Sequence, residues 1–153
     1  MSRRIFLQLR EKYGLAYDVY SYTTNFLDTG SFVISAAVDP KKVIESIDIV
    51  ISELVALRDN VISQDELIKA KEITKGRLML RLEDSRSVSS WVGVQQMLSD
   101  AIRSPEQVIA EIDSVKVTDI TSACNHIIDD KKMCMAIVGP FRNPGQFTKL
   151  VKL

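Results

Sequence analysis

The sequence predicts an α+β fold, in which an antiparallel hairpin and one late strand form a sheet covered by several helices. Two strand-like stretches follow one another early in the chain, helical patterns fill most of the remainder, and a third strand-like stretch comes near the end. Strands gathered in this way, without regular alternation with helices, are typical of α+β domains. The chain has 153 residues, 46% of them hydrophobic, which suits one sizeable core. We expect a domain over residues 1–140 and a tail over 141–153.

The early part of the chain predicts a short helix followed by the hairpin. Residues 5–10 carry apolar side chains at helical spacing, and Gly14 readily adopts the left-handed backbone conformation that ends a helix. The stretch 15–26 is rich in Tyr, Val and Thr, and 32–38 alternates larger apolar residues with smaller ones. The turn signal Asp-Thr-Gly at 28–30 lies between them, so the two stretches are expected to pair antiparallel.

The middle of the chain predicts helices with well-marked starts. Asp39 suits an N-cap, and Pro40 suits the first helical position because its missing N–H is not needed there. Apolar residues then recur every three or four positions over 43–55, and this broad stripe is expected to lie on the sheet. The run Ser-Gln-Asp-Glu at 63–66 has the pattern of a capping box and opens a helix that extends to about Leu82.

The later part of the chain predicts further helices and the last strand. One helix is expected over about 87–102, and Ser104 followed by Pro105 marks the start of another. The stretch 133–138 is the expected late strand of the sheet, since apolar residues fill it and a Gly-Pro pair stops it.

Composition excludes several classes of function. Twenty basic residues balance twenty acidic ones, so no net charge draws the chain to nucleic acid or to an anionic membrane. No apolar run is long enough to span a bilayer, and the basic N-terminus leads into a helical pattern, which is not typical of a signal peptide. The two cysteines, Cys124 and Cys134, lack metal-ligand spacing and are too few for a secreted disulfide framework. We expect a cytoplasmic protein with neither nucleic acid nor membrane as partner.

Arg10 and Tyr17 form the candidate site. Arg10 falls in the last turn of the first helix and Tyr17 in the strand beyond Gly14, so a tight turn can bring the two side chains together. A forked cationic donor and a phenolic hydroxyl suit the binding of a peptide carbonyl, or of the oxyanion formed when water attacks it. The alternative is structural, because basic residues favour helix C-termini and tyrosines are common in strands.

The sequence around Arg10 and Tyr17 resembles that of a known family. Residues 2–6 and 9–21 are similar to the run SRLFQxLREKRGLAYxVYS in the C-terminal half of the pitrilysin and mitochondrial-processing-peptidase family of zinc metallopeptidases. The resemblance continues in family order to about residue 140, through the matches at 28–30, 39–40, 63–71, 104–106 and 138–140. It implies an α+β half-domain of the processing-peptidase type.

The resemblance also implies that two homologous units carry different parts of the active site. In such hydrolases an N-terminal unit carries the zinc motif H-x-x-E-H, whose histidines bind Zn²⁺ and whose glutamate activates the bound water. A facing unit contributes an Arg and a Tyr that hold the substrate backbone, and these match Arg10 and Tyr17. The two residues are thus expected to donate to the scissile-region carbonyl and to stabilise the tetrahedral species.

The departures from the family pattern limit what this chain can do. His126 is the one histidine, so the chain cannot form H-x-x-E-H, and His126 with Asp129 is expected to be a surface or capping pair rather than a metal site. Zn²⁺ is therefore expected in another domain or subunit, and the chain alone is expected to be inactive. Relatives have a further strand–helix unit before the position of Ser2, so we expect an N-terminally truncated domain whose exposed sheet edge promotes self-association.

Three functions follow as hypotheses. The leading one is the substrate-side domain of a zinc metalloendopeptidase that cleaves peptides or presequences held in an extended conformation. The second is a non-catalytic subunit of a heteromeric peptidase, and the third is a structural assembly module. In the first two, the partner is a zinc-bearing homologous domain or subunit.

Overall fold

The computed structural model describes residues 2–98, 101–143 and 145–150. Contacts within the chain divide it into two compact units. Unit 1 consists of residues 1–60 together with 123–153, and unit 2 consists of residues 61–122.

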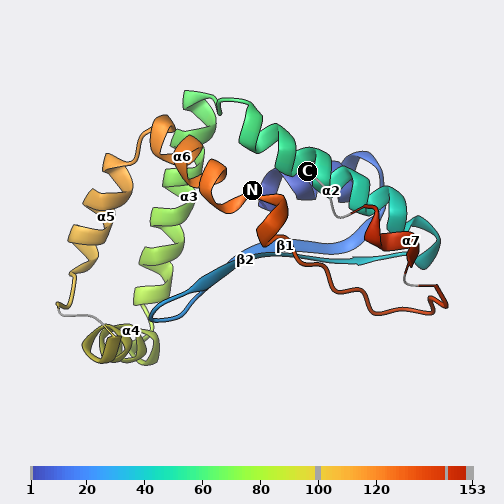
Figure 1. The fold of residues 1–153 in the computed structure, drawn as a ribbon. Coiled ribbons are helices and arrows are strands. Elements are labelled where there is room, and N and C mark those ends of the chain that lie inside the picture. The colour runs from blue at the N-terminus through green and yellow to red at the C-terminus, as the bar shows by residue number, and fades with distance from the viewer. Residues whose placement is uncertain (1, 99–100, 144, 151–153) are drawn as a thin grey trace. The chain divides into compact units, whose positions relative to one another are not determined.

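Unit 1 contains the hairpin and the helices that pack on it (Figure 1). Its first half consists of α1 (Ser2–Phe6), the π-helical segment η1 (Leu7–Lys12), β1 (Ala16–Asn25), β2 (Gly30–Val38), the 3-10 turn η2 (Pro40–Lys42) and α2 (Val43–Asp59). The strands pair antiparallel, and the Phe26 N–H donates to the Thr29 carbonyl across the turn, at 2.8 Å. The predicted helix, turn and hairpin are therefore confirmed, with the strand limits moved by one or two residues.

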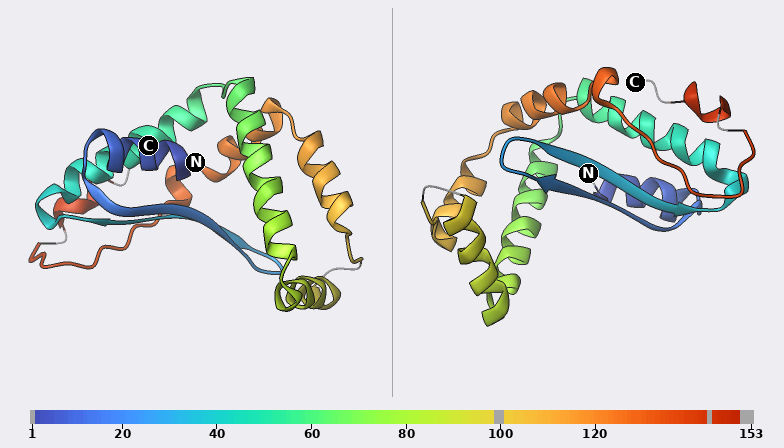
Figure 2. Two further views of the ribbon diagram at one scale, coloured as in Figure 1. Left: turned by 180° about the vertical axis from the view of Figure 1, so that it is seen from behind. Right: turned by 60° about the horizontal axis from the view of Figure 1, so that its bottom comes forward.

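The core of unit 1 lies between the hairpin and the two helices on one of its faces (Figures 1 and 2). Ile5 and Leu9 are almost fully buried, at 1% and 0% exposure, and pack with Val19 of β1. Ile49 and Val50 of α2 pack against this cluster, as the apolar stripe predicts. Asp39 caps η2, since its carboxylate accepts from the Lys41 N–H at 2.8 Å.

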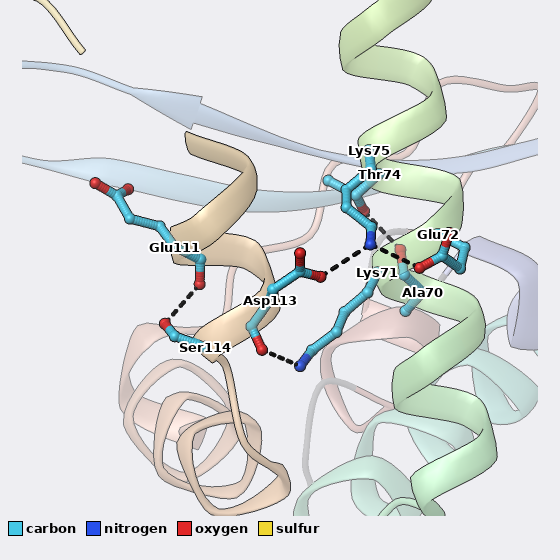
Figure 3. A network of polar contacts seen from close by, with 8 residues as sticks. All are labelled: Ala70, Lys71, Glu72, Thr74, Lys75, Glu111, Asp113 and Ser114. Carbon is cyan, nitrogen blue, oxygen red and sulfur yellow. Dashed lines mark hydrogen bonds and ion pairs between the residues drawn. The ribbon is translucent and has the colours of Figure 1, made fainter. Parts of the chain in front are cut away.

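Unit 2 is built from helices α3 (Gln64–Leu82), α4 (Ser85–Leu98) and α5 (Pro105–Ser114) and the first half of α6 (Val117–Ile127). The Ser63 hydroxyl accepts from the Glu66 N–H at 3.2 Å, which confirms the predicted start of α3. Charged groups tie α3 to α5, as Figure 3 shows: Lys75 Nζ lies 2.9 Å from Asp113 Oδ1, and Lys71 Nζ donates to the Asp113 carbonyl at 2.8 Å.

The α+β class is confirmed, but the prediction that residues 133–138 form a third strand of the sheet is wrong. Within the described residues the sheet contains β1 and β2 alone, and residues 133–138 form no strand ladder. A strand needs a neighbouring backbone edge to pair with, and no described strand pairs with residues 133–138, although residues 132–138 and β2 both line one groove of unit 1. The strand-like composition of 133–138 is therefore not matched by a hydrogen-bonding neighbour.

The end of the chain holds some local structure in its described part. The 3-10 turn η3 (Asp130–Lys132) precedes the unpaired segment, and helix α7 (Gly145–Thr148) follows it. Phe147 is buried at 7% exposure and meets Phe141 edge to face, with ring centroids 5.0 Å apart. No described helix has both the length and the apolar character needed to cross a bilayer.

Candidate functional site

Arg10 projects from the π-helical segment η1. The wider turn is visible in its hydrogen bonds, because the Tyr13 N–H donates to the Gln8 carbonyl at 3.1 Å and the Leu15 N–H donates to the Leu9 carbonyl at 2.7 Å. Leu9 is fully buried, whereas Arg10 is exposed. With Leu9 held in the core, the adjacent Arg10 side chain is directed towards solvent. Single π-helical turns are rare and are frequent at functional sites.

Tyr17 lies at a β-bulge at the start of β1. Ala16 pairs with Val38 and Asp18 pairs with Ala37, so Tyr17 is the extra residue on its strand. Strand side chains normally alternate between faces, and counting back from buried Val19 would turn Tyr17 inward. The bulge shifts the alternation by one, so that Ala16 is buried at 5% exposure and Tyr17 is 86% exposed. Re-aiming a side chain beside a functional site is a recurrent use of such bulges.

The two irregularities bring the candidate residues together. The Arg10 guanidinium carbon lies 5.8 Å from the centroid of the Tyr17 ring and 5.1 Å from that of Phe6. Both distances fall within the range of cation–π attraction, so the rings restrain the guanidinium. Phe6 is the member of this cluster that sequence reasoning missed. Its spacing of four residues from Arg10 on one helical segment is the signal that could have found it.

The cluster is chemically available for an oxygen ligand. Arg10 carries five N–H donors in a rigid fork, and no carboxylate in the described ranges forms an ion pair with it. The exposed Tyr17 hydroxyl adds a further donor. The arrangement can therefore bind a carbonyl or an oxyanion by charge-assisted hydrogen bonds.

Comparison with known proteins places the chain in a family. Residues 1–74 match the profile described as the peptidase M16 inactive domain. An uncharacterized zinc protease of Streptomyces coelicolor is 30% identical over 143 residues, which is 94% of this chain and 31% of that protein. The uncharacterized zinc protease YmxG of Bacillus subtilis is 29% identical over 143 residues, which is 94% of this chain and 35% of that protein. The matched part of the chain, residues 1–74, belongs to the peptidase M16 family.

The chain spans about a third of the length of the curated relatives that it matches. Its fold is also found in a chain of Complex III2 from Candida albicans, bound to Inz-5, with a TM-score of 0.76 and 24% identity. That match covers 85% of this chain and 31% of the other. The α+β half-domain expected from the family resemblance is confirmed.

Among the described residues, His126 is distant from Arg10 in the sequence and is not one of the residues whose rings contact it. It is exposed in the last turn of α6, where its backbone carbonyl accepts from Lys132 Nζ at 2.7 Å. Asp129 uses its carboxylate to cap η3, by accepting from the Lys131 N–H at 3.0 Å. Across the described ranges, no three side chains of the metal-ligating types converge. His126 is therefore an exposed surface residue and Asp129 a capping residue.

Two glycines of the chain provide a matched test of the turn that precedes Tyr17. Gly14 has a φ of 61° and Gly76 lies in the middle of α3, and an added Cβ would meet no atom within 4 Å at either position. Gly14→Ala is expected to destabilise the fold by about 1–2 kcal/mol, because an L-residue is strained in the left-handed region. Gly76→Ala is expected to stabilise it by about 0.5–1 kcal/mol through helix propensity. Urea unfolding measures both, and equal shifts of the same sign would contradict this account.

Proposed function

We propose that the chain is the substrate-side domain of a zinc metalloendopeptidase. One observation carries the proposal: a π-helical turn and a β-bulge, two independent backbone irregularities, place Arg10 and exposed Tyr17 side by side. A purely structural arginine and tyrosine would need neither irregularity. The names of the relatives as zinc proteases support the reaction class.

In this mechanism Arg10 and Tyr17 bind the substrate, and the metal chemistry lies elsewhere. Zn²⁺, held by H-x-x-E-H in a homologous domain or subunit, would lower the pKa of its bound water. Arg10 donates to a backbone carbonyl of an extended peptide, and its positive charge stabilises the negative oxygen that forms when water attacks. Tyr17 donates a second hydrogen bond and fixes the orientation of the peptide. Phe6 stacks on the guanidinium and holds it in place.

A non-catalytic subunit of a heteromeric peptidase is the alternative form of the same proposal. The Arg10–Tyr17 geometry serves both forms, because the residues act on the substrate whether the zinc motif is in the same polypeptide or in a partner. The location of the H-x-x-E-H motif separates them: in the same reading frame as this chain it supports a single-chain peptidase, and only in a neighbouring gene it supports a heteromer. The cytoplasmic setting stays a prediction from cysteine usage.

Reconstitution tests the proposed function. The chain is purified, combined with the H-x-x-E-H unit so identified, and assayed with a fluorogenic peptide. Neither component alone is expected to cleave above background, and the mixture is expected to cleave in a manner that a zinc chelator abolishes. Full activity of the zinc unit without this chain would contradict a role in substrate binding, and so would an inactive mixture that forms a stable complex.

A further inference from the structure

Two exposed tyrosines of the hairpin stack on each other. Tyr20 and Tyr22 alternate along β1 with buried Val19, so they lie on the face of the sheet opposite the core. Their ring centroids are 5.9 Å apart and the rings are inclined by 28°. Each side chain is 46% exposed. The stacked pair is therefore an aromatic surface that a further ring can reach.

Tyr22 lines the same groove as the candidate site. The groove has a volume of about 1470 Å³, and Arg10, Tyr17 and Tyr22 are among the residues that line it. Tyr20 is not among the described residues of the lining, so it supports Tyr22 from outside the groove. The groove thus connects the Arg10–Tyr17 site with an exposed aromatic side chain on the same strand.

The strand sets the distance between the candidate site and Tyr22. Tyr17 and Tyr22 are five residues apart on β1, and the bulge at Tyr17 shortens the advance of the strand. Strands rise about 3.4 Å per residue, so the two positions are about 14–17 Å apart along β1. An extended peptide covers this length in about four or five residues. A peptide that is held by Arg10 and continues along β1 therefore reaches Tyr22 about four or five residues further on.

The charges of the groove favour an uncharged side chain beside Tyr22. Among the described residues that line the groove, the cations are Arg10 and Lys132, and the one carboxylate is that of Asp39. Asp39 is already engaged, because its carboxylate accepts from the Lys41 N–H at 2.8 Å. An arginine or lysine side chain would thus enter a groove of its own charge. An aromatic side chain has no such cost and can stack on the tyrosine ring.

We propose that Tyr22, supported by Tyr20, selects peptides with an aromatic side chain about four or five residues from the carbonyl that Arg10 binds. The proposal rests on the proposed function, because it names the class of peptide that this site prefers. Aromatic pairs favour centroid separations of about 4.5–7 Å. The separation of 5.9 Å between Tyr20 and Tyr22 lies within this range, so a third ring extends the stack with the same geometry.

A peptide series tests the position and the chemistry of the selected side chain. A single phenylalanine is moved, one position at a time, along both sides of the cleaved bond in an otherwise constant fluorogenic peptide of alanine and glutamine. The reconstituted peptidase is expected to show a maximum of kcat/KM, about tenfold above that of the peptide without phenylalanine, at about four or five residues from the cleaved bond. A second series with arginine should show no maximum. A flat phenylalanine profile, or an equal maximum with arginine, would overturn the proposal.

Two threonine variants assign the preference to Tyr22. Tyr22→Thr removes the ring but keeps a residue that favours strands, and it is expected to abolish the maximum. Tyr13→Thr is the matched control and should keep it, because Tyr13 is 47% exposed in the same unit but its ring contacts Lys12 and lies outside the groove lining. Circular dichroism checks that both variants fold, and Tyr22→Val replaces Tyr22→Thr if it does not. Loss of the maximum in both variants or in neither would overturn the assignment.

Tyr20 is a positioning residue in this proposal, because it contacts Tyr22 and does not line the groove. Tyr20→Thr is expected to lower the maximum of the phenylalanine series. Tyr20→Phe keeps the ring and should retain the maximum. Equal losses in the two variants would show that the ring of Tyr20 does not support Tyr22.

A binding measurement separates this proposal from the proposed function. Aromatic ¹H–¹³C NMR spectra of the full chain alone report on the tyrosine rings, and Tyr22→Thr assigns the signals of Tyr22. Titration with the phenylalanine series is expected to shift the Tyr20 and Tyr22 signals but not those of Tyr13, with a lowest Kd about tenfold below that of the peptide without phenylalanine. Equal Kd values across the series would overturn the proposal. This binding preference together with an inactive reconstituted mixture would remove the proposed function and leave the aromatic site at Tyr22 standing.

Discussion

Replacement of Arg10 by alanine is expected to lower kcat/KM of the reconstituted peptidase by at least about tenfold, which corresponds to about 1.4 kcal/mol of transition-state stabilisation. The guanidinium lies against Tyr17 and has no carboxylate partner within the described ranges, so its charge is free to stabilise a developing oxyanion. Since that charge develops in the transition state, the loss should appear mainly in kcat. Initial rates over a range of peptide concentrations measure it.

Tyr17→Phe is expected to act in the same direction, because it removes the hydroxyl but keeps the ring that contacts Arg10. Lys12→Ala is the matched control: it removes a positive charge from the same π-helical segment, but Lys12 contacts the Tyr13 ring and not the cluster. Lys12→Ala should leave the rate within about twofold, as an exposed charge outside the site would. The proposed role is wrong if neither Arg10→Ala nor Tyr17→Phe reaches a tenfold loss.

Truncation of Leu9 to alanine is expected to destabilise the chain by about 2–5 kcal/mol. Leu9 is fully buried in the cluster that joins η1 to β1, so the substitution leaves a cavity at the point where both candidate residues are anchored. Against a total stability of about 5–15 kcal/mol, typical of a native domain, this is the largest stability effect that we expect from a single substitution in unit 1. Chemical denaturation followed by circular dichroism measures it.

Leu7→Ala provides the control for Leu9→Ala. Leu7 has the same side chain in the same π-helical segment but is 43% exposed, so its truncation should cost less than about 1 kcal/mol. A difference between the two variants assigns the effect to burial and not to helix propensity, because both introduce the same residue. Similar losses at the two positions would show that Leu9 is not a core residue.

The sequence determined the features that depend on local chemistry. Gly14, at positive φ, ends the first helix, and the Ser63 hydroxyl caps α3. Both features could be predicted from the sequence because each depends on only a few neighbouring atoms. The hairpin was also predictable, since alternating β-formers on either side of a short turn leave few other arrangements. The family was readable from the run around Arg10 and Tyr17, and the family profile confirms it.

Only the tertiary structure decided how the candidate residues are presented. The exposure of Tyr17 depends on the pairing of Ala16 with Val38 and of Asp18 with Ala37, and a bulge is a property of two strands that one strand's sequence does not reveal. The same limit explains the late segment: residues 133–138 have the composition of a strand, but a strand forms only where a neighbouring backbone edge lies within hydrogen-bonding distance. Local sequence fixes which conformations a segment favours, whereas the partner across the sheet fixes which of them it adopts.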